Sequence, residues 1–192
     1  MSKKELEPFR PISPTPAALI TSIDSRGVPN IITLGEAFNL GLQNPCIVGV
    51  AIRKSRYSHS LIRAEGSFTV NLPRASQVKN VDLCGVISGR KADKFALTGF
   101  TPVPSRFIAP PMIAECPVSM ECELTGIIET GDHDLFMGKV LAVYADEEIL
   151  DDLGRVSPEK METLVFMNNF NHPPEYWSLG KKIASLGFSL KD

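Results

Sequence analysis

The sequence lacks the long apolar segments that mark membrane and secreted proteins. No run approaches the ~18 apolar residues of a membrane-spanning helix, and no apolar stretch follows the basic residues near the start, as a signal peptide requires. A positive excess is missing too, since 20 Lys and Arg face 22 Asp and Glu. Bulk attraction to nucleic acid is therefore not expected. We expect a soluble, cytoplasmic protein that binds neither membrane nor nucleic acid.

Motifs for metal and dinucleotide binding are also missing. The chain has four cysteines but no C-x-x-C pair, so neither a zinc ribbon nor a thioredoxin-type redox motif is indicated. We predict buried thiols at Cys46, Cys84, Cys116 and Cys122. No G-x-G-x-x-G follows a predicted strand, so a nicotinamide nucleotide would have to bind without a Rossmann domain.

What the sequence does contain is many short apolar segments with the pattern of strands. Its 192 residues, 43% of them hydrophobic, fit one domain. The predicted strands comprise two hairpins and two further strands, at residues 17–22 with 29–34, 118–129 with 135–146, 46–52, and 67–72. Strands outnumber helices and no βαβ alternation is found. We predict a mainly β fold, a small antiparallel barrel with appended short helices.

Two short helices are predicted, at residues 58–64 and 78–84. Gly66 and Gly85 come just past their ends, where glycine commonly stops a helix. Ser58 is expected to be the N-cap of the first helix, with its free backbone N–H groups and positive dipole end available to an anion.

Positive charge is concentrated in the middle of the chain. Residues 53–94 contain nine Lys or Arg and three Asp or Glu, whereas residues 114–162 contain three basic and thirteen acidic residues. The basic segment begins at the end of a predicted strand, where cations alternate with hydroxyls as in a phosphate pocket. Ser88 and Gly89 lie in a second basic turn, and glycine there allows close backbone approach to a ligand. A solvated surface would account for the same charges.

A third candidate site is the tip of the second hairpin. There His133 stands between Asp132 and Asp134, which favour the imidazolium form. His133 could then donate to a carbonyl or an anionic ring. A solvated turn histidine is the alternative.

Taken together and in order, these segments resemble the flavin reductase-like proteins of the flavoredoxin type, over about residues 14–166. The residues that carry the resemblance are PNIIT at 29–33, NP at 44–45 before VGVA at 48–51, YS at 57–58 before LI at 61–62, FTVNLP at 68–73, CG at 84–85 with SGR at 88–90 and DKF at 93–95, and GDH at 131–133 with Phe136 and Gly138.

The resemblance implies a six-stranded-type antiparallel split β-barrel that holds FMN non-covalently near the interface of a homodimer. It implies one domain over residues 1–192, with residues 167–192 packing on that domain or on the dimer partner. The positions matching flavin contacts fall into three groups. By resemblance the ring would be lined by Asn30, Thr33, Leu34 and Gly35; the phosphate end would be approached by Arg53, Tyr57 and Ser58; and further contacts would come from Lys94, His133 and Phe166.

One position departs from the family pattern, because Glu36 stands where flavoredoxin-like members often have Trp. Arguments based on that aromatic ring therefore do not transfer. The function implied is an FMN-dependent oxidoreductase that takes electrons from NAD(P)H or a redox protein and passes them to flavin, ferric iron or another protein. The alternatives are a pyridoxamine phosphate oxidase-like enzyme on the same fold and a non-enzymatic ligand- or partner-binding barrel.

Overall fold

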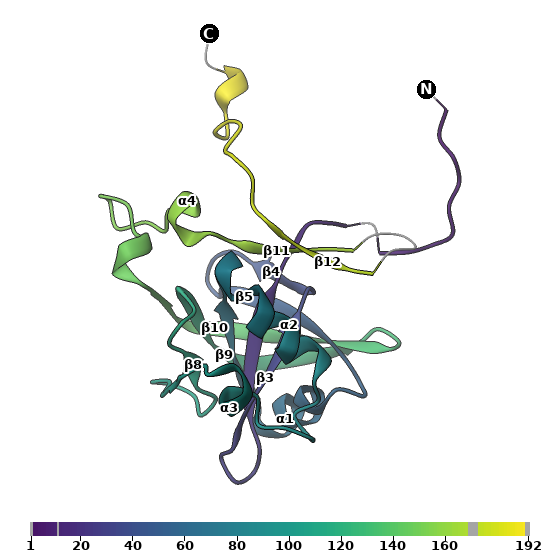
Figure 1. Ribbon diagram of the computed structural model, residues 1–192, viewed down its shortest axis with the longest axis vertical. Coiled ribbons are helices and arrows are strands. Elements are labelled where there is room, and N and C mark those ends of the chain that lie inside the picture. The colour runs from purple at the N-terminus through teal and green to yellow at the C-terminus, as the bar shows by residue number, and fades with distance from the viewer. Residues whose placement is uncertain (1, 11, 169–172, 191–192) are drawn as a thin grey trace.

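The structure is a computed structural model that describes residues 2–10, 12–168 and 173–190. Its main element is a seven-stranded antiparallel sheet in the order β3-β2-β6-β9-β10-β5-β4 (Figure 1). The strands are β2 (Ala18–Ile23), β3 (Pro29–Leu34), β4 (Ala37–Gly41), β5 (Ile47–Arg53), β6 (Ser67–Leu72), β9 (Val118–Glu129) and β10 (His133–Ala145). Strand β3 also contacts β5, so six strands curl into a barrel and β4 pairs with the remaining edge of β5. This confirms the predicted mainly β fold class.

The barrel encloses one apolar core, and a second core lies outside it. All seven strands contribute to the first core, for example through Ile20, Ile32 and Phe136. Neighbouring residues of β2 and β3, such as Leu19 and Ile31, face the second core. Successive side chains of a strand point to opposite faces, so strands between two cores are apolar at nearly every position.

Three helices surround this barrel, and two of their predicted ends are wrong. Helix α1 (Tyr57–Glu65) begins after Arg56, so Ser58 lies inside the first turn and is not the N-cap. Helix α2 (Val78–Val86) runs through Gly85, because its last backbone hydrogen bond joins Ile87 N to Leu83 O.

The other helix ends follow local sequence signals. Helix α1 ends at Gly66 as predicted, in the left-handed conformation (φ 75°) that glycine adopts without strain. Helix α3 (Lys94–Thr98) was not predicted. Its N-cap is Asp93, whose carboxylate accepts from Ala96 N at 3.1 Å.

Smaller elements complete the fold. A three-stranded sheet has the order β1-β11-β12, and a two-stranded one joins β7 to β8. Their bounds are β1 (Thr15–Pro16), β7 (Pro102–Val103), β8 (Met112–Ile113), β11 (Leu164–Met167) and β12 (Glu175–Ser178), with helix α4 at Pro158–Met161 and 3-10 turns at Ala75–Gln77, Glu147–Ile149 and Phe188–Leu190. In the part of the chain that the structure describes, no helix is long and apolar enough to cross a membrane.

All four cysteines are free thiols, but the prediction that all are buried is wrong for one of them. Cys84, Cys116 and Cys122 are buried, whereas Cys46 is exposed in the connection before β5.

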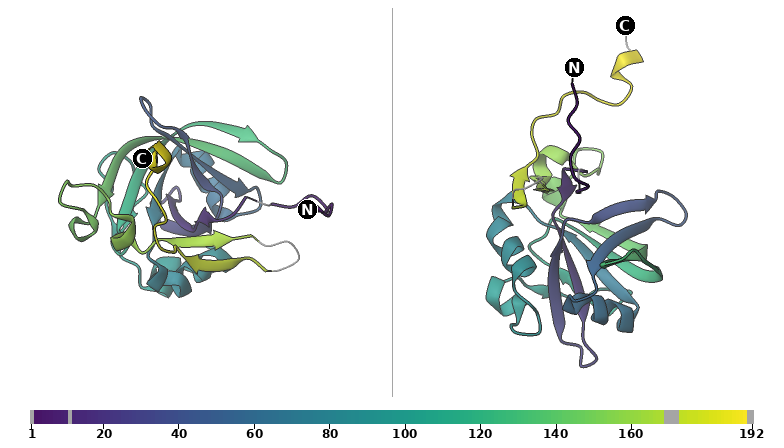
Figure 2. Two further views of the ribbon diagram at one scale, coloured as in Figure 1. Left: turned by 90° about the horizontal axis from the view of Figure 1, so that it is seen from above. Right: turned by 90° about the vertical axis from the view of Figure 1, so that its right-hand side faces the viewer.

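The two terminal segments do not belong to the compact barrel, and both project from it on the same side (Figure 2).

Candidate functional site

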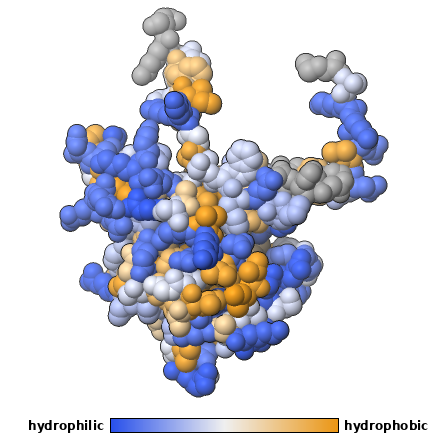
Figure 3. Space-filling model, in the orientation of Figure 1, coloured by the Kyte–Doolittle hydropathy of each residue, from blue (hydrophilic) through white to orange (hydrophobic). Residues whose placement is uncertain are grey.

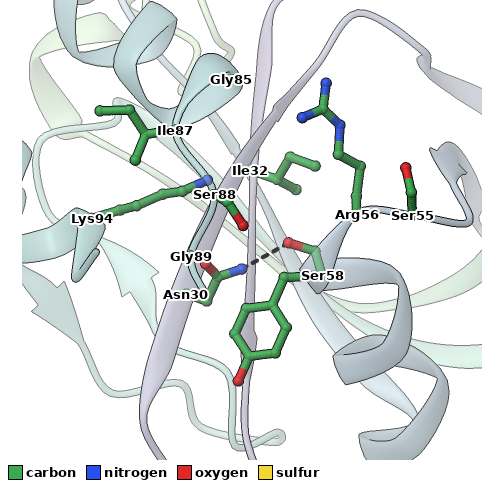
Figure 4. A pocket seen from close by; sticks show the side chains of 11 residues that line it. Asn30, Ile32, Ser55, Arg56, Ser58, Gly85, Ile87, Ser88, Gly89 and Lys94 are labelled. Atoms are coloured by element: carbon green, nitrogen blue, oxygen red, sulfur yellow. Dashed lines mark hydrogen bonds between the residues drawn. The ribbon is translucent and has the colours of Figure 1, made fainter. Parts of the chain in front are cut away.

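A pocket lies between β3, the start of α1 and the segment that joins α2 to α3 (Figure 4). Its cavity volume is about 220 Å³. The residues that line it are Asn30, Ile32, Ser55, Arg56, Tyr57, Ser58, Gly85, Ile87, Ser88, Gly89 and Lys94. Six of the residues proposed from the sequence are thus brought together, although they come from three separate segments: Asn30, Tyr57, Ser58, Ser88, Gly89 and Lys94.

Lys94 supplies a buried cation to this pocket. Its side chain comes from the first turn of α3, and only 4% of the residue is exposed. Nζ donates to Ile31 O and to Cys84 O, at 2.7 Å each. An ammonium has three protons, so one remains available to a ligand. Burial lowers the pKa of Lys94 to about 8, with a further decrease from the charge of Arg56 and an opposing effect of Cys84.

Asn30 and Gly89 form the tightest contact in the pocket. Asn30 Nδ2 donates to Ser58 Oγ at 2.7 Å, and its Oδ1 is buried without a hydrogen-bond partner among the described residues (Figure 4). A Cβ added to Gly89 would lie 1.9 Å from that Oδ1. Only glycine therefore lets the backbone approach Asn30 so closely, and the free Oδ1 marks a place where a donor is missing.

The rim of the pocket is positively charged. Arg56 lines it as the residue before α1, a helix with no acidic residue in its first turn. Arg90 holds its guanidinium 4.9 Å from the centre of the Tyr57 ring and donates to Ser55 O at 3.2 Å. The N-terminal end of a helix with cations around it favours a bound anion.

Arg53 and His133 lie outside this pocket. They are opposite each other on β5 and β10, and both contact Asp132. Arg53 Nη2 is 3.6 Å from Asp132 Oδ2, and His133 Nδ1 is 2.8 Å from Asp132 Oδ1. The hydrogen bond to His133 lowers the pKa of Asp132. Arg56 lines the pocket, whereas the resemblance assigned the phosphate contact to Arg53. Arg53 is the last residue of β5 and Arg56 lies in the turn after it, so the end of the strand separates the two side chains.

The expectation that Asp134 acts on His133 is wrong. Asp134 points to the opposite face of β10, because side chains alternate along a strand. It is 1% exposed and lies 2.8 Å from His59 Nε2 and 3.3 Å from Lys54 Nζ. Burial alone would raise the pKa of Asp134, but these two partners hold it below its usual value. Asp134 thereby ties α1 to β10, next to the pocket residue Ser58.

The remaining predicted contacts lie around the far end of β3. The Thr33 hydroxyl donates to Val81 O, and Leu34 is in the barrel core. A Cβ on Gly35 would lie 2.5 Å from the ring of Phe166, so these two residues pack together. The structure does not bring them to the pocket, and their contact with a flavin stays a prediction. Glu36 nearby forms an ion pair with Arg10.

The sequence placed Ser55 and Arg56 in the basic segment predicted as a phosphate pocket, but they were not among the flavin contacts taken from the resemblance, and Ile87 was missed altogether. For Arg56 a signal existed, because it belongs to the basic segment at residues 53–94. Ile87 carried no signal, since one apolar residue after a helix has many possible surroundings.

The sequence and fold can now be compared with known proteins. The flavin reductase like domain model matches residues 10–169. The structure of flavoredoxin of Desulfovibrio vulgaris (Miyazaki F) superposes with a TM-score of 0.90 at 32% identity, covering 99% of this chain and 100% of that one. Flavoredoxin from Methanosarcina acetivorans gives 0.89 at 30% identity, covering 100% and 98%.

The chain also has a sequence relative whose name assigns no function. An uncharacterized protein of Archaeoglobus fulgidus is 35% identical over 142 residues, which are 74% of this chain and 80% of that protein. These matches confirm the resemblance, the split-barrel fold and the flavin cofactor that were predicted from the sequence. The chain belongs to the flavin reductase like domain family.

Proposed function

We propose that the protein is an FMN-dependent oxidoreductase that passes electrons from NAD(P)H or a redox protein to free flavin, ferric iron or another protein. The observation that carries this proposal is the buried Lys94 with its spare proton, in the pocket of a chain that belongs to a flavin reductase family. When bound, FMN supplies the ring that accepts and releases electrons.

The pocket fits the two chemically different ends of FMN. Arg56, Ser55 and the start of α1 offer charge, hydroxyl and backbone N–H groups to a phosphate. On the other side, Lys94 and the backbone at Gly89 are suited to the carbonyls and nitrogens of the ring, and Asn30 Oδ1 can accept from a ring N–H. These donors and acceptors orient the ring and define which of its edges stays open.

Lys94 has a role beyond binding. A cation fixed in a site with little water stabilises negative charge on a neighbouring ring more than it would in bulk water. Because the ring gains negative character when it is reduced, Lys94 is expected to raise the reduction potential of the bound cofactor. The same residue would thus hold the ring and adjust its affinity for electrons.

A second copy of the chain is part of this proposal. The cavity of about 220 Å³ is smaller than the ~300–1,000 Å³ of sites that enclose a small molecule. FMN would therefore extend beyond one subunit, and a homodimer would cover what a single chain leaves open. The family resemblance independently implies a homodimer.

The test begins with the purified full-length protein. We expect it to carry or take up FMN, seen as visible flavin absorbance and as quenched fluorescence during titration. Anaerobic addition of NADH, NADPH and then a reduced ferredoxin-type protein identifies the donor by bleaching of that absorbance. Failure to take up FMN under any of these conditions would overturn the proposal, and so would bound FMN that no donor reduces.

A further inference from the structure

Helices α1 and α2 both border the pocket, but they are held against the barrel in different ways. Helix α2 packs on the second core through Val81 and Cys84. Hydrophobic side chains also gather on the face of the molecule that α2 occupies, and Val86 of this helix is 65% exposed (Figures 1 and 3). The buried apolar residues of α1, Leu61 and Ile62, come only after its first turn. Apolar packing therefore holds the later part of α1 and not its start.

The start of α1 is the part that reaches the pocket. Arg56 is the N-cap residue, Tyr57 and Ser58 follow it, and all three line the cavity. The Arg56 side chain makes no capping hydrogen bond, and the first turn contains no acidic residue. A helix without a cap has unpaired N–H groups in its first turn and loses the stability that a cap supplies. Other contacts must therefore hold this turn in place.

Two polar contacts do so, and they come from two different strands. Ser58 Oγ accepts from Asn30 Nδ2 of β3 at 2.7 Å. On β10, Asp134 Oδ2 lies 2.8 Å from His59 Nε2. Asp134 and Phe136 are two residues apart on this strand and point to the same face. The His59 ring meets the Phe136 ring edge to face, with the ring centres 5.0 Å apart. Both the position and the orientation of His59 are thus fixed by β10.

The contact between His59 and Asp134 is enclosed, whereas the other partners of Asp134 are not. His59 is 7% exposed and Asp134 1%. Lys54 Nζ lies 3.3 Å from Asp134 Oδ1, and Arg63 Nη1 lies 3.7 Å from Oδ2, but about half of each of these two side chains is exposed. Water weakens exposed ion pairs. Among the described residues, Asp134 is the one carboxylate within ion-pair distance of His59.

We propose that His59 and Asp134 are positioning residues that give the pocket its preference for FMN over riboflavin. The proposal rests on the proposed function, because it takes the start of α1 as the site of the phosphate. Neither residue lines the pocket, so both act through the turn that contains Arg56 and Ser58. Their hydrogen bond holds this turn in the conformation that the phosphate needs. A site that is already ordered binds more tightly, because the ligand does not have to order it.

The first experiment compares the affinities for FMN and riboflavin by fluorescence titration. His59→Leu keeps a bulky side chain but removes the hydrogen-bond donor. We expect FMN affinity to fall about 10-fold and riboflavin affinity to change less than about 3-fold. His59→Gln can still donate to Asp134 through its amide, so its preference for FMN should stay within about 3-fold of the wild type.

Arg63→Ala is the matched control. Arg63 is on the same helix and contacts the same carboxylate, but its side chain is 52% exposed. The affinity for either ligand should therefore change less than about 3-fold.

A second experiment observes the turn in the flavin-free protein by amide hydrogen exchange. In an α-helix the N–H groups of Leu61 and Ile62 donate to carbonyls of the first turn, so their exchange reports its opening. We expect exchange at these two amides to be at least about 10-fold faster in His59→Leu. It should be unchanged in His59→Gln and Arg63→Ala. Amides of α2 should exchange alike in all variants, and faster exchange there as well would contradict a local role.

The outcomes separate this proposal from the proposed function. A wild-type protein that binds no FMN overturns both. If the wild type binds FMN and His59→Leu binds it equally well, the positioning role alone is overturned. An equal loss of FMN and riboflavin affinity would also overturn it, as would a loss in His59→Gln as large as in His59→Leu. The expected result is a loss of affinity specific to FMN that the glutamine variant restores, together with opening of the first turn of α1.

Discussion

Lys94 and the pair Arg53–His133 are basic side chains in two contrasting settings. Lys94 is buried, bonded to two backbone carbonyls, and directed into a pocket. Arg53 and His133 lie at the ends of the paired strands β5 and β10, where both already contact the carboxylate of Asp132. All three matched flavin-contacting positions of the family. A charge acts more strongly on a ligand where it is desolvated, so we expect Lys94 to affect a bound flavin more than Arg53 or His133 does.

The largest effect on FMN affinity is expected at Gly89, because that residue shapes the pocket of Lys94 without carrying charge. In Gly89→Ala the new Cβ would meet Asn30 Oδ1 at 1.9 Å, and overpacking of this kind typically costs about 1–3 kcal/mol. Since the ligand must use the same space, we expect FMN affinity to fall by at least about 100-fold. Fluorescence titration measures it. Gly180→Ala, which meets no neighbour, should bind as wild type.

Lys94→Met removes the charge and keeps much of the apolar stem. Charge-assisted hydrogen bonds are worth about 1.5–3 kcal/mol, so FMN affinity should fall about 10- to 100-fold. A loss of about 1.4 kcal/mol in differential stabilisation of the reduced cofactor would lower the two-electron midpoint potential by ~30 mV. Lys91→Met, at an exposed neighbouring lysine, is the control. Equal effects of the two variants would mean that burial is irrelevant.

The pH dependence gives a second view of Lys94. Its pKa of about 8 means that the empty site is mainly cationic below pH 8 and loses its charge above it, while the phosphate of FMN is already dianionic above about pH 7. FMN affinity should therefore begin to fall as the pH passes 8, by about 10-fold at most. Lys94→Arg stays charged, so its affinity should be flat over this range. A flat wild-type profile would contradict the assignment.

The barrel was largely predictable from the sequence because its strands alternate or are apolar on both faces. The hairpin of β9 and β10 and the end of α1 at Gly66 follow from such local signals. The end of α2 was not predictable, because Gly85 could continue or stop a helix and packing on β3 decided it.

For the candidate site, the sequence indicated which residues to consider but not where their side chains point. Asn30, Ser58 and Lys94 line one pocket; the resemblance assigned all three to the flavin and no spacing connected them, and their contact with a flavin stays a prediction. His133 and Asp134 point to opposite faces of β10, because side chains alternate along a strand. Their directions can be assigned only once the position of the strand in the sheet is known. Burial of Lys94 depends on contacts with Ile31 and Cys84, which lie 63 and 10 residues away in the chain.

Arg56 and Arg53 provide the next test, because they are the same residue type three positions apart. Arg56 lines the pocket, so Arg56→Ala should weaken FMN about 10-fold through the loss of one charge-assisted contact to phosphate. Riboflavin, which lacks the phosphate, should be nearly unaffected. If riboflavin lost the same affinity, Arg56 would act on the ring and the orientation of the ligand would be reversed.

The smallest effects are expected for Arg53→Ala and His133→Asn. Each residue contacts Asp132 near the surface, and exposed ion pairs contribute only about 0–1 kcal/mol. Neither lines the pocket, so FMN affinity should change less than about 3-fold in either variant. Stability to urea should change as little, because no buried group loses a partner. A large loss of affinity in the dimer would show that Arg53 and His133 of one subunit reach the flavin of the other. The variant with both Arg53→Ala and His133→Asn would then fail to bind FMN as a dimer but bind it like the wild type as a monomer. Comparing FMN affinity in the two oligomeric states therefore distinguishes a contact across the interface from one within a chain.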